Sequence, residues 1–248
     1  MNKLYYDRDP RDVPLYSVRE AASYLKIPPA TLHQWIKWEV DLSQPEPRPV
    51  EPLICLPDRE AKELSFFNLV EAHLLQVLRL VSGDHRAQMK AALAKVERLL
   101  ETPRPLTDKT FQTCGVDLLV HAFGQSAKLS RSKQLIMGTQ LQHLLTRLEW
   151  DAEGKVTRLF PILKPGAGTE LDQPLMIDPR VSFGRPVMTG TGVPTSIVAD
   201  LFEAGDSIEA IAEDYNCKPE QQETLSRPLP KTTTANPSKS PPPFTSSL

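Results

Sequence analysis

The segment Ile177–Ser196 constrains the fold of this chain more than any other part of the sequence. It reads IDPRVSFGRPVMTGTGVPTS and contains three glycines and three prolines within 20 residues. Because glycine permits positive φ and proline fixes φ near −65°, no continuous helix can run through this segment. We expect short β segments at residues 181–182 and 187–188, with turns at 183–186 and 190–192. Short strands of this kind have unpaired edges, which favour pairing with another chain.

The residues around this segment complete a small C-terminal module. Helices are expected at residues 196–204, 207–215 and 219–225, and Ser207 is a good N-cap for the second of them. Residues 174–225 would then form a β-hairpin followed by three helices, in a helix-turn-helix-like arrangement. This module carries three basic and nine acidic side chains, a net charge of −6. Such a charge repels phosphate backbones and attracts basic surfaces.

Five residues of the module are candidates for partner binding or assembly. Arg180, Phe183 and Arg185 lie in the turn-rich segment, and Glu209 and Glu213 lie one helical turn apart in the second expected helix. Neighbouring acidic side chains give this helix an acidic face. One interpretation is that the face docks on a basic protein surface, and the other is that it is only a solvated surface.

The same segment does not match the motifs of catalytic sites. The glycines near Thr191 suggest a phosphate loop, but the P-loop pattern requires a lysine before the Ser or Thr, and none is present. Ser182 and Asp178 have no histidine nearby in the sequence, which argues against a hydrolase triad. The three cysteines lack metal-binding spacing, and their odd number argues against a disulfide framework. We therefore expect a protein that is not an enzyme and has no metal or cofactor.

Near the N-terminus, the segment Tyr16–Lys37 (YSVREAASYLKIPPATLHQWIK) predicts two short helices joined by a tight turn. Ser17 and Glu20 form a capping box for the first helix. The second helix is expected at residues 30–38, with its apolar side chains facing inward. A DNA-binding unit of this type needs an exposed second helix with polar side chains toward the base edges.

The candidate DNA-binding residues are Arg19, Thr31, His33, Gln34 and Lys37. Gln34 has the amide group that reads adenine, whereas Lys37 and Arg19 are suited to contact phosphates. The region is not basic overall, so dimerisation would be needed to double the contacts. The alternative is a helical hairpin that only packs against the rest of the protein.

Between these two regions the pattern is mainly helical. The Pro-rich stretch 44–57 contains a short apolar strand at 53–56, which could be one arm of a two-stranded wing. Helices are expected at 65–81, 85–100 and 131–149, and strands at 109–113, 117–123 and 155–163. The expected fold class is mainly α with short β segments: a winged helix-turn-helix domain at 12–82, a middle α+β region at 83–165, the module at 174–225 and a disordered Pro/Ser/Thr tail at 226–248.

The sequence also gives an expectation about location. The first residues are polar and charged, and charged or polar residues interrupt the longest apolar stretches every few positions. We therefore expect a cytoplasmic protein with no signal peptide and no membrane contact.

The N-terminal segment resembles the winged helix-turn-helix of the MerR and excisionase group. The matching residues are Tyr16, Ser17, Glu20, Ala21, Leu25, Thr31, Leu32, Trp35 and Ile36. Residues 64–71 also resemble the helix that follows the wing in that group. Recognition helices there often carry arginine pairs beside the aromatic residue, whereas this chain has His33 and Gln34.

The C-terminal module is similar to a small domain-of-unknown-function family, number 433, found in antitoxins of VapB type. The matching residues are Asp178, Pro179, Val181, Gly184, Pro186, Gly190, Thr191, Pro194, Gly205, Ser207, Ile208, Ile211, Ala212 and Tyr215. This resemblance implies a homodimer or higher assembly that binds a PIN-like ribonuclease toxin and represses its own operon by binding operator DNA. One departure is that residues 225–228 (LSRP) stop the last helix early.

Three hypotheses about function follow from the sequence. The first is an antitoxin that binds operator DNA with its N-terminal domain and its toxin with the C-terminal module. The second is a stand-alone MerR-like transcription regulator whose C-terminal module serves oligomerisation. The third, an enzyme that acts on nucleic acid, lacks a catalytic constellation.

Overall fold

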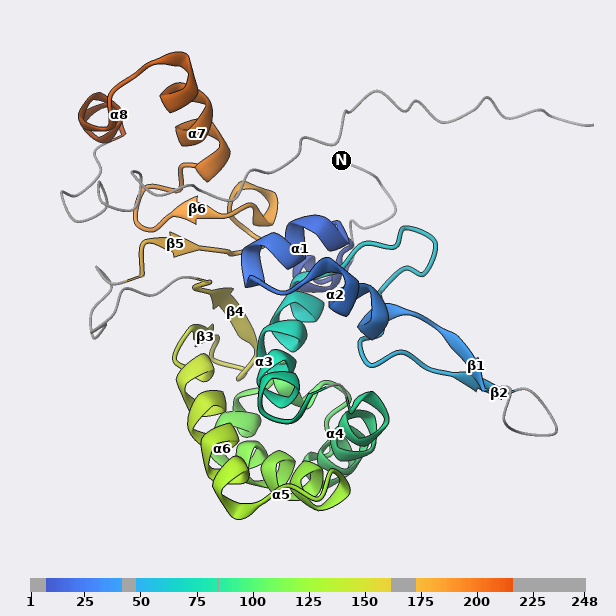
Figure 1. Ribbon diagram of the computed structural model, residues 1–248. Helices are drawn as coiled ribbons and strands as arrows, with labels where there is room; N and C mark the ends of the chain where they lie inside the picture. Colours follow the sequence, from blue (N-terminus) through green and yellow to red (C-terminus); the bar gives the residue numbers. More distant parts are fainter. Residues whose placement is uncertain (1–7, 42–47, 84, 162–172, 216–248) are drawn as a thin grey trace, which may run out of the picture.

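The computed structural model describes residues 8–41, 48–83, 85–161 and 173–215 of the 248-residue chain. Helices dominate this part of the chain, and its strands form three two-stranded antiparallel sheets. The expected fold class, mainly α with short β segments, is confirmed. Figure 1 shows a bundle of helices, with the N-terminal helices and a projecting hairpin on one side and the C-terminal helices beyond a layer of short strands.

The N-terminal part of the fold, which we call the head, begins with helices α1 (Val18–Leu25) and α2 (Pro29–Ile36). The capping box predicted for α1 is present: Ser17 Oγ accepts from Glu20 N at 3.2 Å, and Glu20 Oε2 accepts from Ser17 N at 2.9 Å. Pro29 starts α2 at a position where a missing N–H costs nothing. The sequence therefore predicted both helices of the head to within a few residues.

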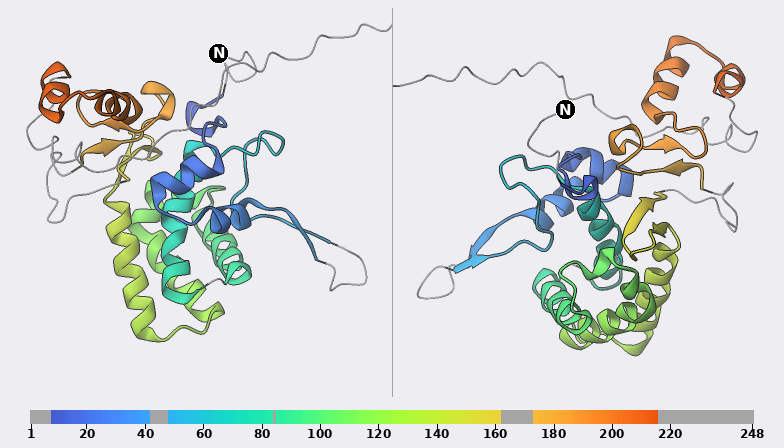
Figure 2. Two further views of the ribbon diagram at one scale, coloured as in Figure 1. Left: turned by 45° about the horizontal axis from the view of Figure 1, so that its top comes forward. Right: turned by 180° about the vertical axis from the view of Figure 1, so that it is seen from behind.

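A hairpin of strands β1 (Glu39–Asp41) and β2 (Arg48–Val50) follows α2. It projects away from the body of the molecule, as both views of Figure 2 show. The expected strand at 53–56 is wrong, because the backbone of this segment bonds to helices. Ile54 N donates to Trp35 O at 3.0 Å, and Cys55 O accepts from Asn68 Nδ2 at 3.0 Å.

Four helices form the bundle: α3 (Phe66–Ser82), α4 (Arg86–Leu100), α5 (Val116–Ser126) and α6 (Arg131–Leu145). Helix α3 packs against α6, and α5 packs against both α4 and α6. One hydrophobic core runs without interruption from the head into this bundle. It includes Trp35, Leu78, Phe123 and Leu159, all of which are at most 1% exposed.

Two expected strands in the middle region are wrong. Residues 109–113 and 117–123 instead belong to a π-helical turn (Phe111–Gly115) and to α5. Val116, Leu119 and Phe123 are buried, and their spacing of three and four residues is that of a helix packed on one face. Short apolar runs are ambiguous between strand and helix, and here packing against α4 and α6 decides for the helix.

A layer of short strands joins the bundle to the C-terminal module. Strand β3 (Leu148–Trp150) pairs with β4 (Val156–Leu159). The helix expected at 131–149 therefore ends earlier, at Leu145. Leu159 then exchanges two backbone hydrogen bonds of 3.0 and 2.9 Å with Ile177. Directly before Ile177 in the sequence, β5 (Leu175–Met176) pairs with β6 (Val187–Met188).

This pairing corrects two expectations about the C-terminal segment. The partner of residues 187–188 is 175–176, not 181–182, because residues 182–184 form a tight turn. The strand edges are also less open than expected. Ile177 continues the line of β5 and bonds to Leu159, and Val187 of β6 forms a further bridge with Pro194.

Two helices complete the described part of the module: α7 (Thr195–Ala204) and α8 (Ile208–Asp214). The module has its own small core, which includes Leu175, Met188, Val198 and Ile211. Both helices lie where the sequence predicts them. The third expected helix at 219–225 and the tail at 226–248 lie outside the described residues.

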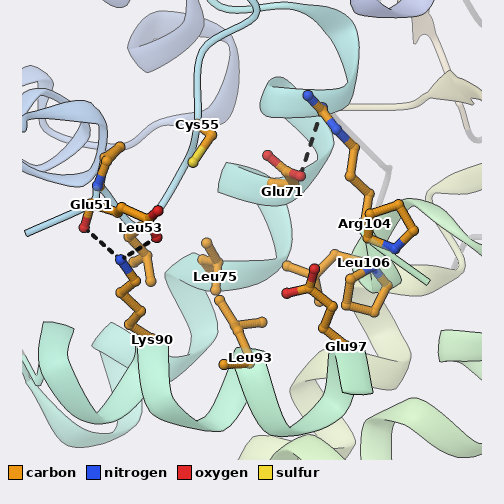
Figure 3. A pocket seen from close by; sticks show the side chains of 14 residues that line it. Glu51, Leu53, Cys55, Glu71, Leu75, Lys90, Leu93, Glu97, Arg104 and Leu106 are labelled. Carbon is orange, nitrogen blue, oxygen red and sulfur yellow. Dashed lines mark hydrogen bonds and ion pairs between the residues drawn. The ribbon is translucent and has the colours of Figure 1, made fainter. Parts of the chain in front are cut away.

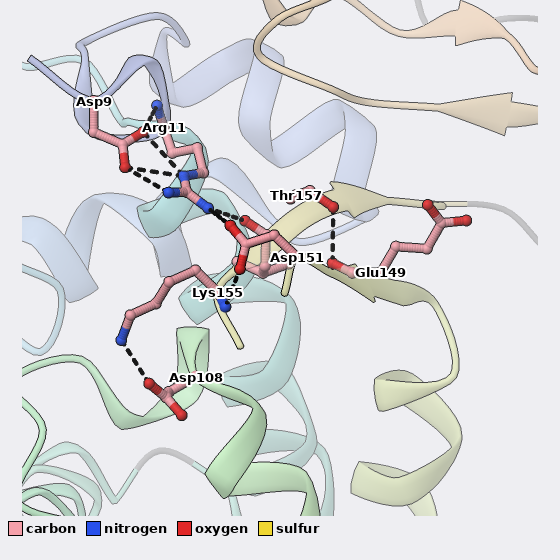
Figure 4. Close-up of polar contacts among 8 residues, drawn as sticks. Asp9, Arg11, Asp108, Glu149, Asp151, Lys155 and Thr157 are labelled. Carbon is pink, nitrogen blue, oxygen red and sulfur yellow. Dashed lines mark hydrogen bonds and ion pairs between the residues drawn. The ribbon is translucent and has the colours of Figure 1, made fainter. Parts of the chain in front are cut away.

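Polar contacts fix the N-terminal end of the head to the middle region (Figure 4). The guanidinium of Arg11, which is 8% exposed, bonds to Asp9 and donates to Asp151 Oδ2 at 2.7 Å. Close by, Lys155 Nζ donates to Asp108 Oδ2 at 2.5 Å. Arg11 and Asp151 are 140 positions apart in the sequence, so this ion pair holds the head to the middle region in addition to the shared core. None of the helices in the described ranges is long and apolar enough to cross a bilayer.

Candidate DNA-binding and partner-binding surfaces

The exposed side of α2 carries three of the candidate DNA-binding residues. His33, Gln34 and Lys37 are all exposed, and Arg19 is exposed on α1. Thr31 was expected to be exposed, but the structure buries it to 6% exposure. Thr31 lies four residues before the buried Trp35 and therefore shares its helix face. Thr31 is thus a packing residue, and the candidate surface consists of the other four.

His33, Gln34 and Lys37 line a groove of about 330 Å³ whose floor is apolar. A loop that could not be placed from the sequence also lines the groove, with Arg59 and Lys62. Both of these side chains are exposed. The loop follows the hairpin, and nothing in its local sequence indicates that it folds back beside α2.

Arg59 is held in a defined position in this groove. Its guanidinium carbon lies 3.8 Å from the centre of the Trp38 ring, which is a close cation–π contact. Both Arg59 and Trp38 line the groove. Lys37, Arg59 and Lys62 thus place three positive charges around one groove, a suitable arrangement for phosphate oxygens.

Much of the Ile177–Ser196 segment serves to fix the module to the rest of the protein. Asp178 is 5% exposed, and it accepts from Arg158 Nε at 3.1 Å and from Arg180 N at 2.9 Å. Tyr16 Oη, next to the N-cap of α1, donates to Gly184 O at 2.9 Å within the interior. Burial raises the pKa of Tyr16 far above its usual value, so the phenol stays protonated as the donor.

Gly184 is required at this contact for two reasons. Its φ is +72°, and a Cβ built there would lie 2.5 Å from Tyr16 Oη. A side chain at this position would therefore strain the backbone and displace the tyrosine. The close approach of this backbone to Tyr16 explains why a glycine stands here, a role that the sequence alone did not indicate.

The exposed part of the same segment is a strained turn that presents Phe183. Ser182, Phe183 and Gly184 have consecutive positive φ values of 47°, 55° and 72°. Two hydrogen bonds support the turn, from Gly184 N to Val181 O at 2.9 Å and from Ser182 Oγ to Gly192 O at 3.2 Å. A left-handed conformation at a bulky residue costs about 1–3 kcal/mol and is frequently found at functional sites.

The turn brings together three of the candidate partner-binding residues. Phe183 is 72% exposed, and Arg180 and Arg185 on either side of it in the sequence are also exposed. An exposed aromatic ring with neighbouring arginines has the composition of a protein–protein hot spot. These residues were candidates from the sequence, whereas the three consecutive left-handed residues of the turn have no local sequence signal.

The other candidate partner-binding residues lie on α8. Glu209 and Glu213 are exposed, whereas Ile211 and Ala212 on the other side of the helix are buried in the core of the module. Asp206 and Asp214 are exposed as well. The structure therefore gives α8 one buried apolar face and one acidic face.

These features define a mainly helical protein whose head has two short helices and a projecting hairpin, and whose small C-terminal module is docked on that head. Residues 176–224 match a family described as Protein of unknown function (DUF433). The chain is 25% identical over 228 residues to a Mycobacterium tuberculosis (strain ATCC 25618 / H37Rv) protein named "Putative antitoxin VapB45", and the match covers 85% of this chain and 91% of that protein.

A solved structure has the same fold. The X-ray crystal structure of Rv2018 from Mycobacterium tuberculosis matches with a TM-score of 0.65 and 24% identity, over 86% of this chain and 97% of that one. The similarity to the family numbered 433, expected from the sequence, is confirmed for residues 176–224. Together with the similarity to the named antitoxin, it supports a relationship to an antitoxin-like family.

Proposed function

We propose that this chain is the antitoxin of a type II toxin–antitoxin pair, which neutralises a PIN-like ribonuclease toxin and represses its own operon. The observation that carries this proposal is the similarity to "Putative antitoxin VapB45", which extends over 85% of this chain and is not limited to the module. The proposal includes a cytoplasmic location and no catalytic activity of the chain itself.

The toxin-binding part of the proposal rests on the C-terminal module. Phe183 would insert into an apolar pocket of the toxin, since it is a large side chain exposed on a turn of three consecutive left-handed residues. Glu209 and Glu213 would face basic residues that otherwise bind RNA, so that the antitoxin competes with the substrate.

The DNA-binding part rests on the groove beside α2. His33 and Gln34 would reach base edges, while Arg19, Lys37, Arg59 and Lys62, which are exposed, would contact phosphates. We propose that the chain acts as a homodimer or higher assembly, because a single groove of this size gives few contacts with an operator.

Co-expression with the adjacent reading frame tests the toxin-binding part. A short neighbouring gene whose product has the spaced aspartates of a PIN-type ribonuclease should yield a complex that co-purifies with this chain. The double variant Glu209→Lys/Glu213→Lys should weaken the complex at low salt and have a smaller effect at high salt. Glu153→Lys, a charge reversal in the turn between β3 and β4, is the matched control and should leave affinity unchanged.

A stand-alone MerR-like regulator is the second candidate function. It is favoured by the contact between Tyr16 and Gly184, since a module fixed to the head in this way could serve oligomerisation without a toxin. Such a protein would bind its operator but would neither co-purify with the neighbouring gene product nor inhibit its ribonuclease activity.

A further inference from the structure

The cavity between α3, α4 and the segment after the hairpin contains ion pairs that balance charge within it (Figure 3). Glu71 is paired with Arg104 at 3.8 Å, and Lys90 Nζ donates to Glu51 Oε2 at 3.1 Å. The outer face of α6 is different. Large apolar side chains are exposed on it, and the cations at the start of the helix form no ion pair with another described residue.

Seven exposed residues form the outer face of α6. They recur at spacings of one and three residues and therefore share one side of the helix. The seven are Ser132, Leu135, Ile136, Thr139, Gln142, His143 and Thr146. The opposite side of α6 holds Met137, Leu141 and Leu144 in the core. Leu135 is 66% exposed and Ile136 is 54% exposed, and the face contains no Asp, Glu, Lys or Arg.

The apolar part of this face continues onto α3, which packs beside α6 (Figure 1). Leu80, near the end of α3, is 73% exposed. Leu80 and Ile136 both line a groove of about 350 Å³, together with Val77 and Val81. An exposed apolar surface with a polar surround is typical of a protein–protein contact.

The charges of α6 are confined to one end of the helix. Arg131 and Lys133 lie in its first turn, and the helix has no acidic residue. The macrodipole gives a helix positive charge at its N-terminus and negative charge at its C-terminus, so cations are unfavourable at the start. Negative charge brought beside this end from outside would therefore be stabilising.

We propose that the outer face of α6 is the contact between two copies of this chain, packed antiparallel across a two-fold axis. This arrangement brings Arg131 and Lys133 of one copy beside the negative C-terminal end of α6 in the other. A parallel arrangement would bring the cations of both copies together. The uncharged middle of the face can meet its own copy without burying an unpaired charge. The inference rests on the homodimer of the proposed function and assigns its interface.

The antiparallel arrangement makes a geometric prediction. Thr139 is the middle residue of the face and therefore lies near its own copy. Ser132, two helical turns earlier, is about 10 Å from Thr139 along the helix, so Ser132 and its copy are about 20 Å apart. A disulfide needs Cα atoms within about 7 Å, and only a cysteine at position 139 can then link to its own copy.

Gel filtration with light scattering measures the assembly of the full-length chain in the absence of toxin and DNA. We expect twice the mass of the chain. Leu135→Lys should raise the dissociation constant of the dimer about tenfold or more, because it buries an unpaired charge in each copy. Leu99→Lys is the matched control: Leu99 of α4 is 52% exposed, and the same charge there should leave the dimer intact. Both leucines are exposed, so circular dichroism should show unchanged folding.

Cysteine cross-linking tests the arrangement of the two copies. The background is a full-length chain with Cys55→Ser, Cys114→Ser and Cys217→Ser, whose mass by light scattering should match that of the unmodified dimer. In this background, mild oxidation of Thr139→Cys should give a covalent dimer on a non-reducing gel. Ser132→Cys, on the same exposed face, should remain unlinked.

The possible failures are distinguishable. A monomeric unmodified chain would overturn the proposal, leave this face to a different protein, and also remove the homodimer from the proposed function. A dimer that Leu135→Lys leaves intact would overturn the interface alone. Any pattern other than cross-linking at position 139 without cross-linking at position 132 would overturn the antiparallel arrangement.

Discussion

Replacing Gly184 with alanine tests how the C-terminal module is fixed to the head. Two costs add at this position. The left-handed backbone, with φ of +72°, costs about 1–2 kcal/mol for alanine. The new Cβ would lie 2.5 Å from Tyr16 Oη, so the buried hydrogen bond is lost at a further cost of about 1–3 kcal/mol. The free energy of unfolding should therefore fall by about 2–5 kcal/mol.

Gly190→Ala is the matched control for this substitution. Gly190 has a similar φ of +82°, but no atom lies within 4 Å of a Cβ built there. Its replacement should cost only the backbone part, about 1–2 kcal/mol. The difference between the two variants measures the close contacts of the new Cβ, of which the one with Tyr16 Oη is the shortest.

A double-mutant cycle with Tyr16→Phe completes the test. Removing the hydroxyl leaves the Gly184 carbonyl without its donor, at a cost of about 1–3 kcal/mol, but it also removes the atom that clashes with the new Cβ. In this background, Gly184→Ala should cost only slightly more than Gly190→Ala, because the remaining contacts of the new Cβ, with Leu15 Cδ1 and the ring of residue 16, are at 3.3 Å.

Urea denaturation gives the free energies, and hydrogen exchange of peptides that span residues 175–195 reports local opening of the module. Equal effects of Gly184→Ala and Gly190→Ala in the unmodified background would refute the reasoning. Additive effects of Tyr16→Phe and Gly184→Ala would do so as well.

Three further predictions concern the groove beside α2, a buried histidine and Arg11. The slope of log affinity against log salt is negative, and Arg59→Ala and Lys62→Ala should each reduce its magnitude by about 0.9 in titrations with operator DNA. An unchanged slope would exclude a phosphate contact. Burial, followed by the charge of Arg147, lowers the pKa of His73 to about 3. Below pH 6.5 the unfolded chain therefore binds a proton that the folded chain does not. The free energy of unfolding should fall by up to about 1.4 kcal/mol per pH unit as the pH drops from 6.5 toward 3. His73→Met should flatten this dependence in urea titrations, and a parallel curve would contradict the assignment. Arg11→Met should lower the free energy of unfolding by about 1–3 kcal/mol, because it leaves the partly exposed carboxylates of Asp9 and Asp151 without their cation. A loss below about 0.5 kcal/mol would show that the pairs contribute little.

The sequence predicted those elements whose signals are local. Ser17 with Glu20 marks the start of α1, and Ser207 marks the start of α8; both act through hydrogen bonds within one helical turn. The same holds for the long apolar periodicity of α3. In these places local propensity and tertiary packing favour the same structure.

The sequence failed where a distant segment decides the structure. Residues 117–123 alternate enough to resemble a strand, but packing against α4 and α6 makes them helical. The strand partner of residues 187–188 is 175–176, and no local signal separates this pairing from a tight hairpin. Thr31 was assigned to the exposed side of α2, although its position relative to Trp35 places it inside.

The candidate site was likewise predictable only in part. His33, Gln34 and Lys37 could be named because helical periodicity separates them from the apolar face of α2. Arg59 and Lys62 could not, since they reach the groove through a loop more than 20 positions along the chain from α2. Phe183 was named from its sequence context, whereas its exposure depends on three consecutive left-handed residues.

The central claim is that the C-terminal module captures and inhibits a ribonuclease. The most direct test titrates the purified product of the adjacent gene with this chain and follows cleavage of a fluorescent RNA. We predict stoichiometric inhibition by the unmodified chain, at least tenfold weaker inhibition by Phe183→Ala because hot-spot residues contribute about 2 kcal/mol or more, and unchanged inhibition by Phe202→Ala, which removes another exposed ring of the module. Undiminished ribonuclease activity at a molar excess of the unmodified chain would contradict the account.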